Sequence, residues 1–267
     1  MSKLHIRQGG SPHENRLPVV LLHGWSCHGG FFEGLMRDLR DETLLLAPDL
    51  PGHGKTGADV DLTIEAAADA VNDLLEERGL NRVVLVGWSM GAHVAYALIE
   101  RHGTSRLASL VVEDMTPKVL NDDAWHLGTK NGNNATLNLQ LINTIETQWP
   151  LLAEAVAKGI LAEGLEPDPD LLAFNRREML AANPPQIAAM WASLTAQDFR
   201  PLMAKIDIPV HLARGARSPL YGRNVAEWQA ERLADATIHE FPRSGHAPHM
   251  EEPEAFADFL RSLITVR

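Results

Sequence analysis

The chain has 267 residues, 45% hydrophobic and 22% charged, a composition typical of a globular protein with one core, with or without an insertion. Its formal net charge of −11 at pH 7 argues against a nucleic acid or an anionic membrane surface as partner, because both recruit basic patches. The single cysteine, Cys27, excludes an intramolecular disulfide, and no apolar run approaches a signal-peptide core or the ~18 residues of a membrane span. We therefore expect a soluble cytoplasmic protein.

Short apolar runs alternate with helical patterns along the chain. Strands are predicted at residues 19–22, 44–47, 83–86, 110–112, 209–213 and 237–241. Helices are predicted at residues 63–78, 90–102, 223–233 and 251–264. Most of the strand runs are continuously apolar, which favours parallel strands covered by helices on both faces. The sequence therefore predicts the α/β class, with a mostly parallel sheet and right-handed crossovers.

Residues 116–206 interrupt this alternation with a helical pattern and no convincing strand. Prolines are expected to cut the interval into short helices, at Pro150, Pro167, Pro169, Pro184 and Pro185. Since ligands bind at the carboxyl ends of parallel strands, we expect residues 116–206 to form a helical lid over a site. The core would then comprise residues 1–115 and 207–267. A helical subdomain with its own small core is the alternative.

A serine lies between two glycines where the strand at 83–86 gives way to the helix at 90–102, in Gly87-Trp88-Ser89-Met90-Gly91. In this context the glycines relieve crowding of the backbone, and the serine is lifted above the sheet on a strained turn. The pattern predicts that Ser89 is a nucleophile.

A serine nucleophile needs a base and an anion site. His246 lies in the loop between the last predicted strand and the last helix, which places it after Ser89 in the order expected for a base. The backbone N–H groups of Trp25 and Met90 are the expected oxyanion donors, because each follows a strand end at a glycine turn or opens a helix. His23 is interpreted as bracing the first turn, and His249 as a helix-entry residue rather than a metal ligand.

Four motifs in this order resemble the alpha/beta-hydrolase superfamily. They are His23-Gly24-Trp25, Pro48-Asp49-Leu50-Pro51-Gly52-His53-Gly54, Gly87-Trp88-Ser89-Met90-Gly91 and Gly245-His246. The resemblance covers nearly the whole chain outside the lid. It implies an alpha/beta-hydrolase fold and serine chemistry, with Ser89 as nucleophile, His246 as base, and Trp25 and Met90 as oxyanion donors.

The acid of the triad is not at the position that many family members use. There the family has Gly-x-x-Asp, whereas this chain has Gly215-Ala216-Arg217-Ser218, and a hydroxyl cannot stabilise an imidazolium as a carboxylate does. Two carboxylates, Glu113 and Asp114, end the strand that precedes the lid. The stretch from Asp114 to Pro117 is similar to a turn of a small-esterase branch, which implies Asp114 as the acid. Glu113 is the rival, since haloalkane-dehalogenase-like proteins place a glutamate there.

Serine as nucleophile predicts acyl transfer through an acyl-serine intermediate, and so a carboxylic ester hydrolase, with thioesters and lactones as related substrates. The alternatives are a carbon–carbon-bond hydrolase, a cofactor-free oxygenase on the same fold, and a ligand receptor with slow or no turnover. No metal or organic cofactor is implied, and the expected partner is a small acyl compound.

Tryptophans and lid cations are candidates for contacts with the substrate. The expected pocket residues are Trp88, Trp125, Trp149 and Trp191, with Trp25 also beside the reacting atoms, although lid tryptophans could equally form the lid's own core. Cations that could hold a substrate carboxylate or phosphate are Lys118, Lys130, Arg176 and Arg177, although scattered charges of this kind are more often solvated.

Overall fold

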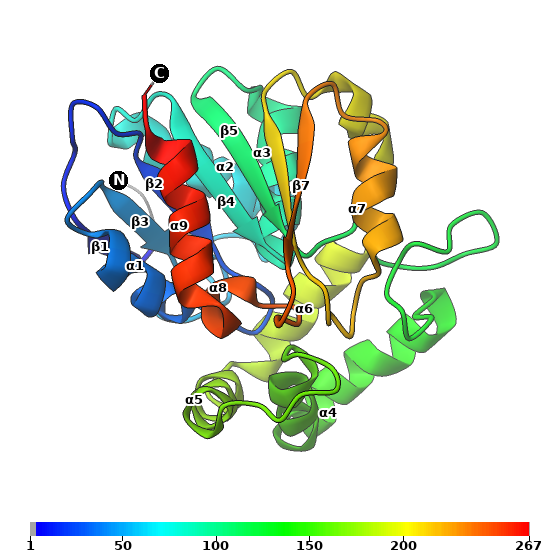
Figure 1. Ribbon diagram of the computed structural model, residues 1–267. Helices are drawn as coiled ribbons and strands as arrows, with labels where there is room; N and C mark the ends of the chain where they lie inside the picture. Colours follow the sequence, from blue (N-terminus) through cyan, green and yellow to red (C-terminus); the bar gives the residue numbers. More distant parts are fainter. Residues whose placement is uncertain (1–3, 267) are drawn as a thin grey trace.

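The computed structural model describes residues 4–266, which form a seven-stranded sheet with helices on both faces (Figure 1). The strand order is β1-β3-β2-β4-β5-β6-β7, and every neighbouring pair is parallel except β1 and β3. The strands are β1 (Ile6–Gly9), β2 (Val19–Leu22), β3 (Leu45–Pro48), β4 (Val83–Trp88), β5 (Leu107–Glu113), β6 (Val210–Gly215) and β7 (Ala236–Phe241). The helices are η1 (Gly29–Phe32), α1 (Glu33–Leu39), α2 (Ile64–Glu77), α3 (Met90–His102), α4 (Ala135–Gly159), α5 (Pro169–Leu180), α6 (Pro184–Thr195), η2 (Arg200–Lys205), α7 (Arg223–Ala230), α8 (Pro248–Glu251) and α9 (Pro253–Ile264). The predicted α/β class is confirmed.

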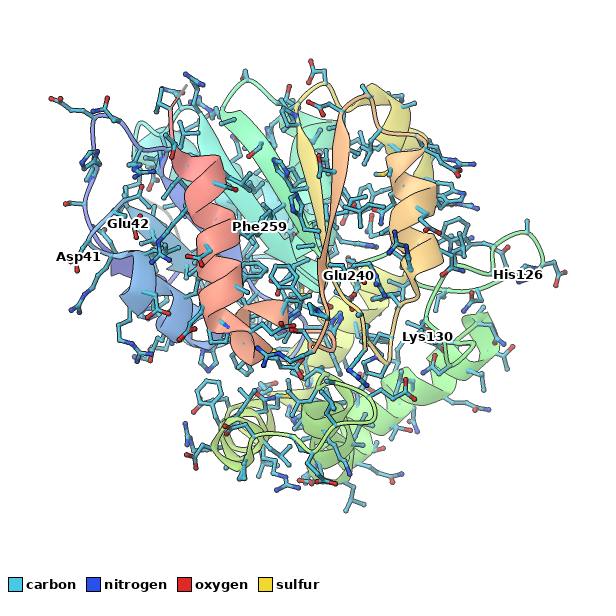
Figure 2. The ribbon with its side chains drawn as sticks, viewed as in Figure 1. Asp41, Glu42, His126, Lys130, Glu240 and Phe259 are labelled. Atoms are coloured by element: carbon cyan, nitrogen blue, oxygen red, sulfur yellow. The ribbon has the colours of Figure 1, made fainter. Side chains whose placement is uncertain are left out.

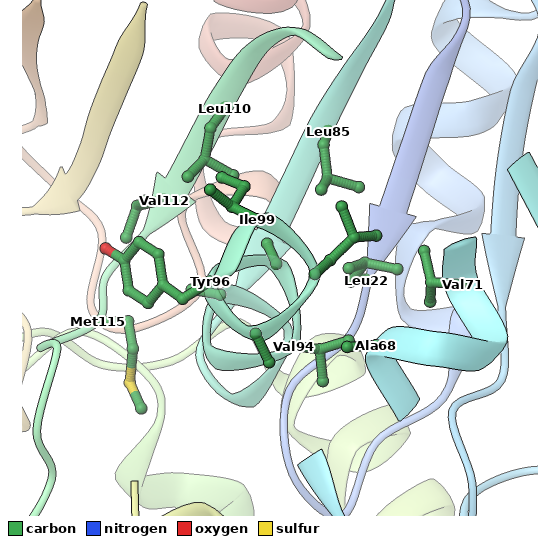
Figure 3. Packing of buried hydrophobic residues seen from close by; sticks show 14 of the residues in the cluster. Leu22, Ala68, Val71, Leu85, Val94, Tyr96, Ile99, Leu110, Val112 and Met115 are labelled. Carbon is green, nitrogen blue, oxygen red and sulfur yellow. The ribbon is translucent and has the colours of Figure 1, made fainter. Parts of the chain in front are cut away.

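Strands β2, β3 and β4 are apolar throughout because both of their faces are covered. In β2, Val20 and Leu22 pack with α2 and α3, whereas Val19 and Leu21 pack with α1 and α9. Figure 3 shows the first of these layers, in which Tyr96 of α3 lies against the strands. Burial of each such side chain contributes about 1.5–3 kcal/mol, so this double layer fixes the position of every strand end.

The observed strands β2 to β7 lie close to the predicted ranges, and β2 and α3 have the predicted limits. Helix α2 begins at Ile64, one residue after the predicted start, because Thr63 caps it: the Thr63 hydroxyl accepts a hydrogen bond from the Ala66 N–H at 3.1 Å. Four elements outside residues 116–206 were not anticipated, namely β1, η1, α1 and the short α8.

Helices α4, α5 and α6 lie between β5 and β6 in sequence and below the sheet in Figure 1. The prediction that Pro150 interrupts the helix is confirmed. Helix α4 consists of two helical segments joined by a kink, because Gln148, two residues before Pro150, leaves helical geometry at φ −135° and ψ 25°. Pro169 and Pro184 open α5 and α6, as expected for prolines at helix starts.

Within residues 4–266, no helix combines the length and the apolarity needed to cross a membrane.

Candidate active site

Ser89 occupies a sharp turn between β4 and α3. Its backbone has φ 53° and ψ −119°, a conformation that residues other than glycine rarely adopt. Gly87 and Gly91 make the turn possible, because a Cβ on Gly91 would come within 2.1 Å of the carbonyl oxygen of Leu22, and one on Gly87 within 2.6 Å of the Ala92 nitrogen. The turn therefore holds Ser89 at the carboxyl end of the sheet in a strained but well-supported geometry.

His246 is paired with Asp114 across this end of the sheet. Its Nδ1 lies 2.7 Å from Asp114 Oδ2, and the two side chains are 2% and 1% exposed. The same carboxylate oxygen accepts a hydrogen bond from the hydroxyl of Ser218 at 2.6 Å. Ser218 and His246 therefore contact the same carboxylate oxygen of Asp114. A carboxylate at Nδ1 leaves Nε2 as the ring nitrogen available to accept a proton.

The backbone on either side of His246 is also held. The His246 N–H donates to the carbonyl oxygen of Ile160, just after α4, at 2.8 Å, and the indole N–H of Trp88 donates to the His246 carbonyl at 2.7 Å. Both Ser89 and His246 line one cavity. Trp88, the residue before Ser89, therefore holds the loop that carries His246.

Glu113, the rival acid, faces a different histidine. Its Oε1 accepts a hydrogen bond from the His249 N–H at 3.0 Å and lies 2.8 Å from His249 Nδ1. Glu113 is the last residue of β5, whereas Asp114 follows it with a backbone φ of 46°, and the two side chains reach separate partners. His249 is the second residue of α8 and is buried, and the described residues contain no group of three potential metal ligands around it or elsewhere.

The turn after β2 is braced by His23. Its Nδ1 lies 2.8 Å from the Gly24 carbonyl oxygen, and its Nε2 accepts the Leu50 N–H at 2.9 Å. Burial holds the pKa of His23 well below its usual range, so the ring is a neutral brace. Trp25 follows this turn, and its indole N–H donates to the Ile187 carbonyl of α6 at 2.7 Å.

Above Ser89 and His246 lies a cavity of about 300 Å³. Its walls come from the strand ends, from α4 and α6, and from the loops that precede α4 and α7. The lining residues are Gly24, Trp25, Cys27, Trp88, Ser89, Met115, Val119, Thr129, Asn131, Asn133, Leu141, Leu152, Ala155, Val156, Gly159, Ile160, Trp191, Leu194, Leu220, Tyr221 and His246. The walls are mainly apolar, and burial raises the pKa values of the Cys27 thiol and the Tyr221 hydroxyl, which stay neutral.

Three of the five tryptophans singled out from the sequence line this cavity, namely Trp25, Trp88 and Trp191. The prediction for Trp125 and Trp149 needs correction. Trp149 is buried behind Trp25, at 5.4 Å between ring centroids, and its indole N–H donates to a backbone carbonyl of α5. Trp125 packs edge-on against Trp228, at 4.9 Å between ring centroids. Both rings form core contacts, as large aromatic side chains commonly do.

The four cations proposed from the sequence do not line the cavity and have partners elsewhere. Lys118 pairs with Asp122, and Arg176 and Arg177 pair with glutamates on α4 and α5. Lys130, on the loop before α4 in Figure 2, donates to the Ser218 carbonyl oxygen at 2.5 Å. A charged group of a substrate would therefore find no cation inside the cavity.

Sequence reasoning missed much of the cavity wall. Leu152 and Val156 of α4 are one helical turn apart, a spacing from which their shared face could have been found. Tyr221 and the asparagines Asn131 and Asn133 come from irregular loops, where the sequence carries no periodic signal.

Residues 19–259 match the model of the alpha/beta hydrolase family. The chain is 29% identical over 266 residues to a pimeloyl-[acyl-carrier protein] methyl ester esterase of Nitrosomonas europaea, covering 98% of this chain and 100% of that protein. It is 31% identical over 247 residues to the enzyme of the same name from Chromobacterium violaceum, covering 92% of each. Its fold is similar to that of an esterase (EaEST) from Exiguobacterium antarcticum, with a TM-score of 0.88 over 97% of this chain and 94% of that chain at 23% identity.

Proposed function

The chain belongs to the alpha/beta hydrolase family and is a carboxylic ester hydrolase, and we propose that its substrate is the methyl ester of a medium-length acyl group, such as a carrier-linked pimeloyl methyl ester. The names of the relatives support this substrate, since they match the chain over at least 92% of its length. The cavity supports it independently.

The single observation that carries the proposal is the uncharged, mainly apolar cavity that opens on Ser89 and His246. At about 300 Å³ it has the size of a small ligand pocket, which suits an acyl chain of medium length. A methyl ester is neutral and fits this environment, whereas a free carboxylate would be buried there without a cation to pair with. Hydrolysis converts the neutral methyl ester into a carboxylate, so the reaction itself favours release of the acid from the cavity.

Ser89, His246 and Asp114 are the proposed catalytic residues. Ser89 Oγ attacks the ester carbonyl carbon while His246 Nε2 takes the hydroxyl proton, and Asp114 stabilises the imidazolium that forms. His246 then returns the proton to the leaving methoxide, methanol departs, and the acyl group remains on Ser89 as an ester. Water enters, gives its proton to His246 and attacks the acyl carbon, and the acid leaves as Ser89 regains its hydrogen.

The backbone N–H groups of Trp25 and Met90 are the proposed oxyanion donors. Met90 is the first residue of α3, so its N–H has no acceptor within the helix and lies at the positive end of the helix dipole. Trp25 N–H follows the turn that His23 braces. Removal of one such donor typically costs ~3 kcal/mol of transition-state stabilisation.

Residues 116–206 are proposed as a lid on a core made of residues 1–115 and 207–267. Helices α4 and α6 supply Leu141, Leu152, Val156 and Trp191 to the wall of the cavity that Ser89 also lines. A lid in this place would exclude water from the acyl chain while the ester is attacked.

The test compares the monomethyl ester of pimelate, alone and linked to a carrier protein through its other carboxyl group, with p-nitrophenyl esters of increasing chain length. We expect methanol release from the methyl ester, with kcat/KM highest when the acyl chain is of medium length. Ser89→Ala serves as the matched control for background hydrolysis. Turnover confined to acetyl esters, or cleavage of the thioester to the carrier in place of the methyl ester, would contradict the proposed substrate.

A further inference from the structure

A second buried pair, Glu113 with His249, lies beside the pair formed by Asp114 and His246. Both side chains of the second pair are 0% exposed, and Glu113 Oε1 contacts both the backbone N–H and the ring Nδ1 of His249. Aromatic rings enclose the imidazole, with Phe32 at 4.5 Å and Trp88 at 4.8 Å between centroids. Glu113 Oε2 and His249 Nε2 have no hydrogen-bond partner among the described residues.

Stability alone is a poor explanation for this pair. Burial of a carboxylate and an imidazole costs free energy, and replacement of buried pairs by apolar residues of similar size is often neutral or stabilising. The position of the pair is more informative. Glu113 precedes Asp114 at the end of β5, and His249 follows His246 by three residues, so the pair ties together the two segments that carry the catalytic acid and base.

Glu113 also contacts the nucleophile's backbone, since its carbonyl oxygen accepts the Ser89 N–H at 3.0 Å. One residue thus bonds to the Ser89 turn through its main chain and to the histidine loop through its side chain. Asp114, the next residue, is in the left-handed region at φ 46°, where backbone support on both sides is needed to hold its direction.

We propose that Glu113 and His249 are positioning residues that hold His246 against Asp114. The inference rests on the proposed role of His246 as the base. Without the bonds to Glu113, the loop at 246–249 shifts away from β5 and the imidazole loses its alignment with Asp114 and Ser89. A misplacement of about 1 Å in such a constellation can cost ~100-fold in rate.

The experiment compares Glu113→Ala and Glu113→Gln on a p-nitrophenyl ester, with Tyr96→Phe as matched control. Tyr96→Phe also removes one buried hydrogen bond, to Gln229 at 2.6 Å, but on the opposite face of the sheet. We expect Glu113→Ala to lower kcat by about tenfold or more at unchanged KM. Glu113→Gln keeps an oxygen that accepts both bonds and recovers most of the lost kcat. Tyr96→Phe leaves kcat unchanged.

A second variant guards against a failure to fold. The double substitution Glu113→Leu with His249→Phe fills the same space with apolar groups and keeps the packing while it removes the bonds. If this folded variant, or folded Glu113→Ala, has the kcat of the wild type, the proposal is overturned. Ser89→Ala and His246→Ala are run beside them. Turnover in those two would overturn the proposed catalytic residues, whereas their inactivity beside unaffected Glu113 variants would overturn the positioning role alone.

Discussion

Asp114→Asn tests whether the carboxylate at the end of β5 is the triad acid. Asp114 Oδ2 lies 2.7 Å from His246 Nδ1, and the side chain is almost fully buried, so water cannot replace the charge. An amide keeps the shape but cannot stabilise the imidazolium formed in the transition state. Loss of a triad acid lowers kcat by about 10²- to 10⁴-fold, or about 3 to 5 kcal/mol of transition-state stabilisation.

The structure also indicates where the lost charge could be restored. Ser218 Oγ is 2.6 Å from Asp114 Oδ2, so an aspartate at 218 would bring a carboxylate to the same end of the imidazole. We expect Asp114→Asn with Ser218→Asp to regain at least about tenfold in kcat over Asp114→Asn alone. Asp114→Asn with Ser218→Asn is the matched control, because it has the same shape and no charge.

The assay is the single-turnover rate of acylation by a p-nitrophenyl ester, measured from the release of p-nitrophenol. Ser218→Asp alone places two carboxylates side by side, and their mutual repulsion is expected to slow the enzyme at neutral pH. Acylation that is intact in Asp114→Asn, or equal rates for the charged and uncharged double variants, would refute the assignment of Asp114.

Three further predictions concern packing, specificity and pH. Gly91→Ala would drive a Cβ against the backbone of β2, so we expect this variant not to fold. Gly34→Ala, whose Cβ would have its nearest neighbour at 3.9 Å, should raise the free energy of unfolding by about 0.5–1 kcal/mol, because alanine favours the helix. Urea titrations of both variants measure these changes. Val156→Phe narrows the cavity, so kcat/KM should fall more for long acyl esters than for acetate, while Leu151→Phe, at a position 77% exposed, should leave that ratio unchanged. Burial lowers the pKa of His93 to about 4. Between pH 6.5 and about 4 the unfolded chain therefore binds a proton that the folded chain does not, and the free energy of unfolding decreases as the pH is lowered. In His93→Gln this decline should be shallower by up to about 1 kcal/mol per pH unit in urea titrations, and an unchanged slope would show that His93 does not contribute.

The elements that sequence patterns predicted well are those whose identity depends on local chemistry. Strands such as β2 and β4 are apolar at every position because both faces are buried, and α3 begins at the turn that its glycines require. Ser89 and His246 stand in glycine-containing motifs with a fixed place in the chain, and the structure brings both to one cavity.

The features that the sequence left open depend on contacts between distant residues. Asp114 and Glu113 are adjacent, and only the fold shows that one reaches His246 and the other His249, 132 and 136 residues further along. Strand β1 is four residues long with no fully buried position, so its pairing with β3 leaves little periodic signal. From the sequence, Trp125 and Trp149 could have lined the cavity or formed part of the core. In the fold, contacts with distant residues place both rings in the core, Trp125 against Trp228 and Trp149 against Trp25.

The most direct test of the account is to identify the residue that carries the acyl group. A rapid acid quench during turnover of a p-nitrophenyl ester, followed by mass spectrometry of the digested protein, should show the acyl mass on the peptide that contains Ser89. Ser89→Ala should show neither adduct nor turnover. An adduct on another residue, or undiminished hydrolysis by Ser89→Ala, would contradict the central claim that this chain cleaves esters through an acyl-serine at Ser89.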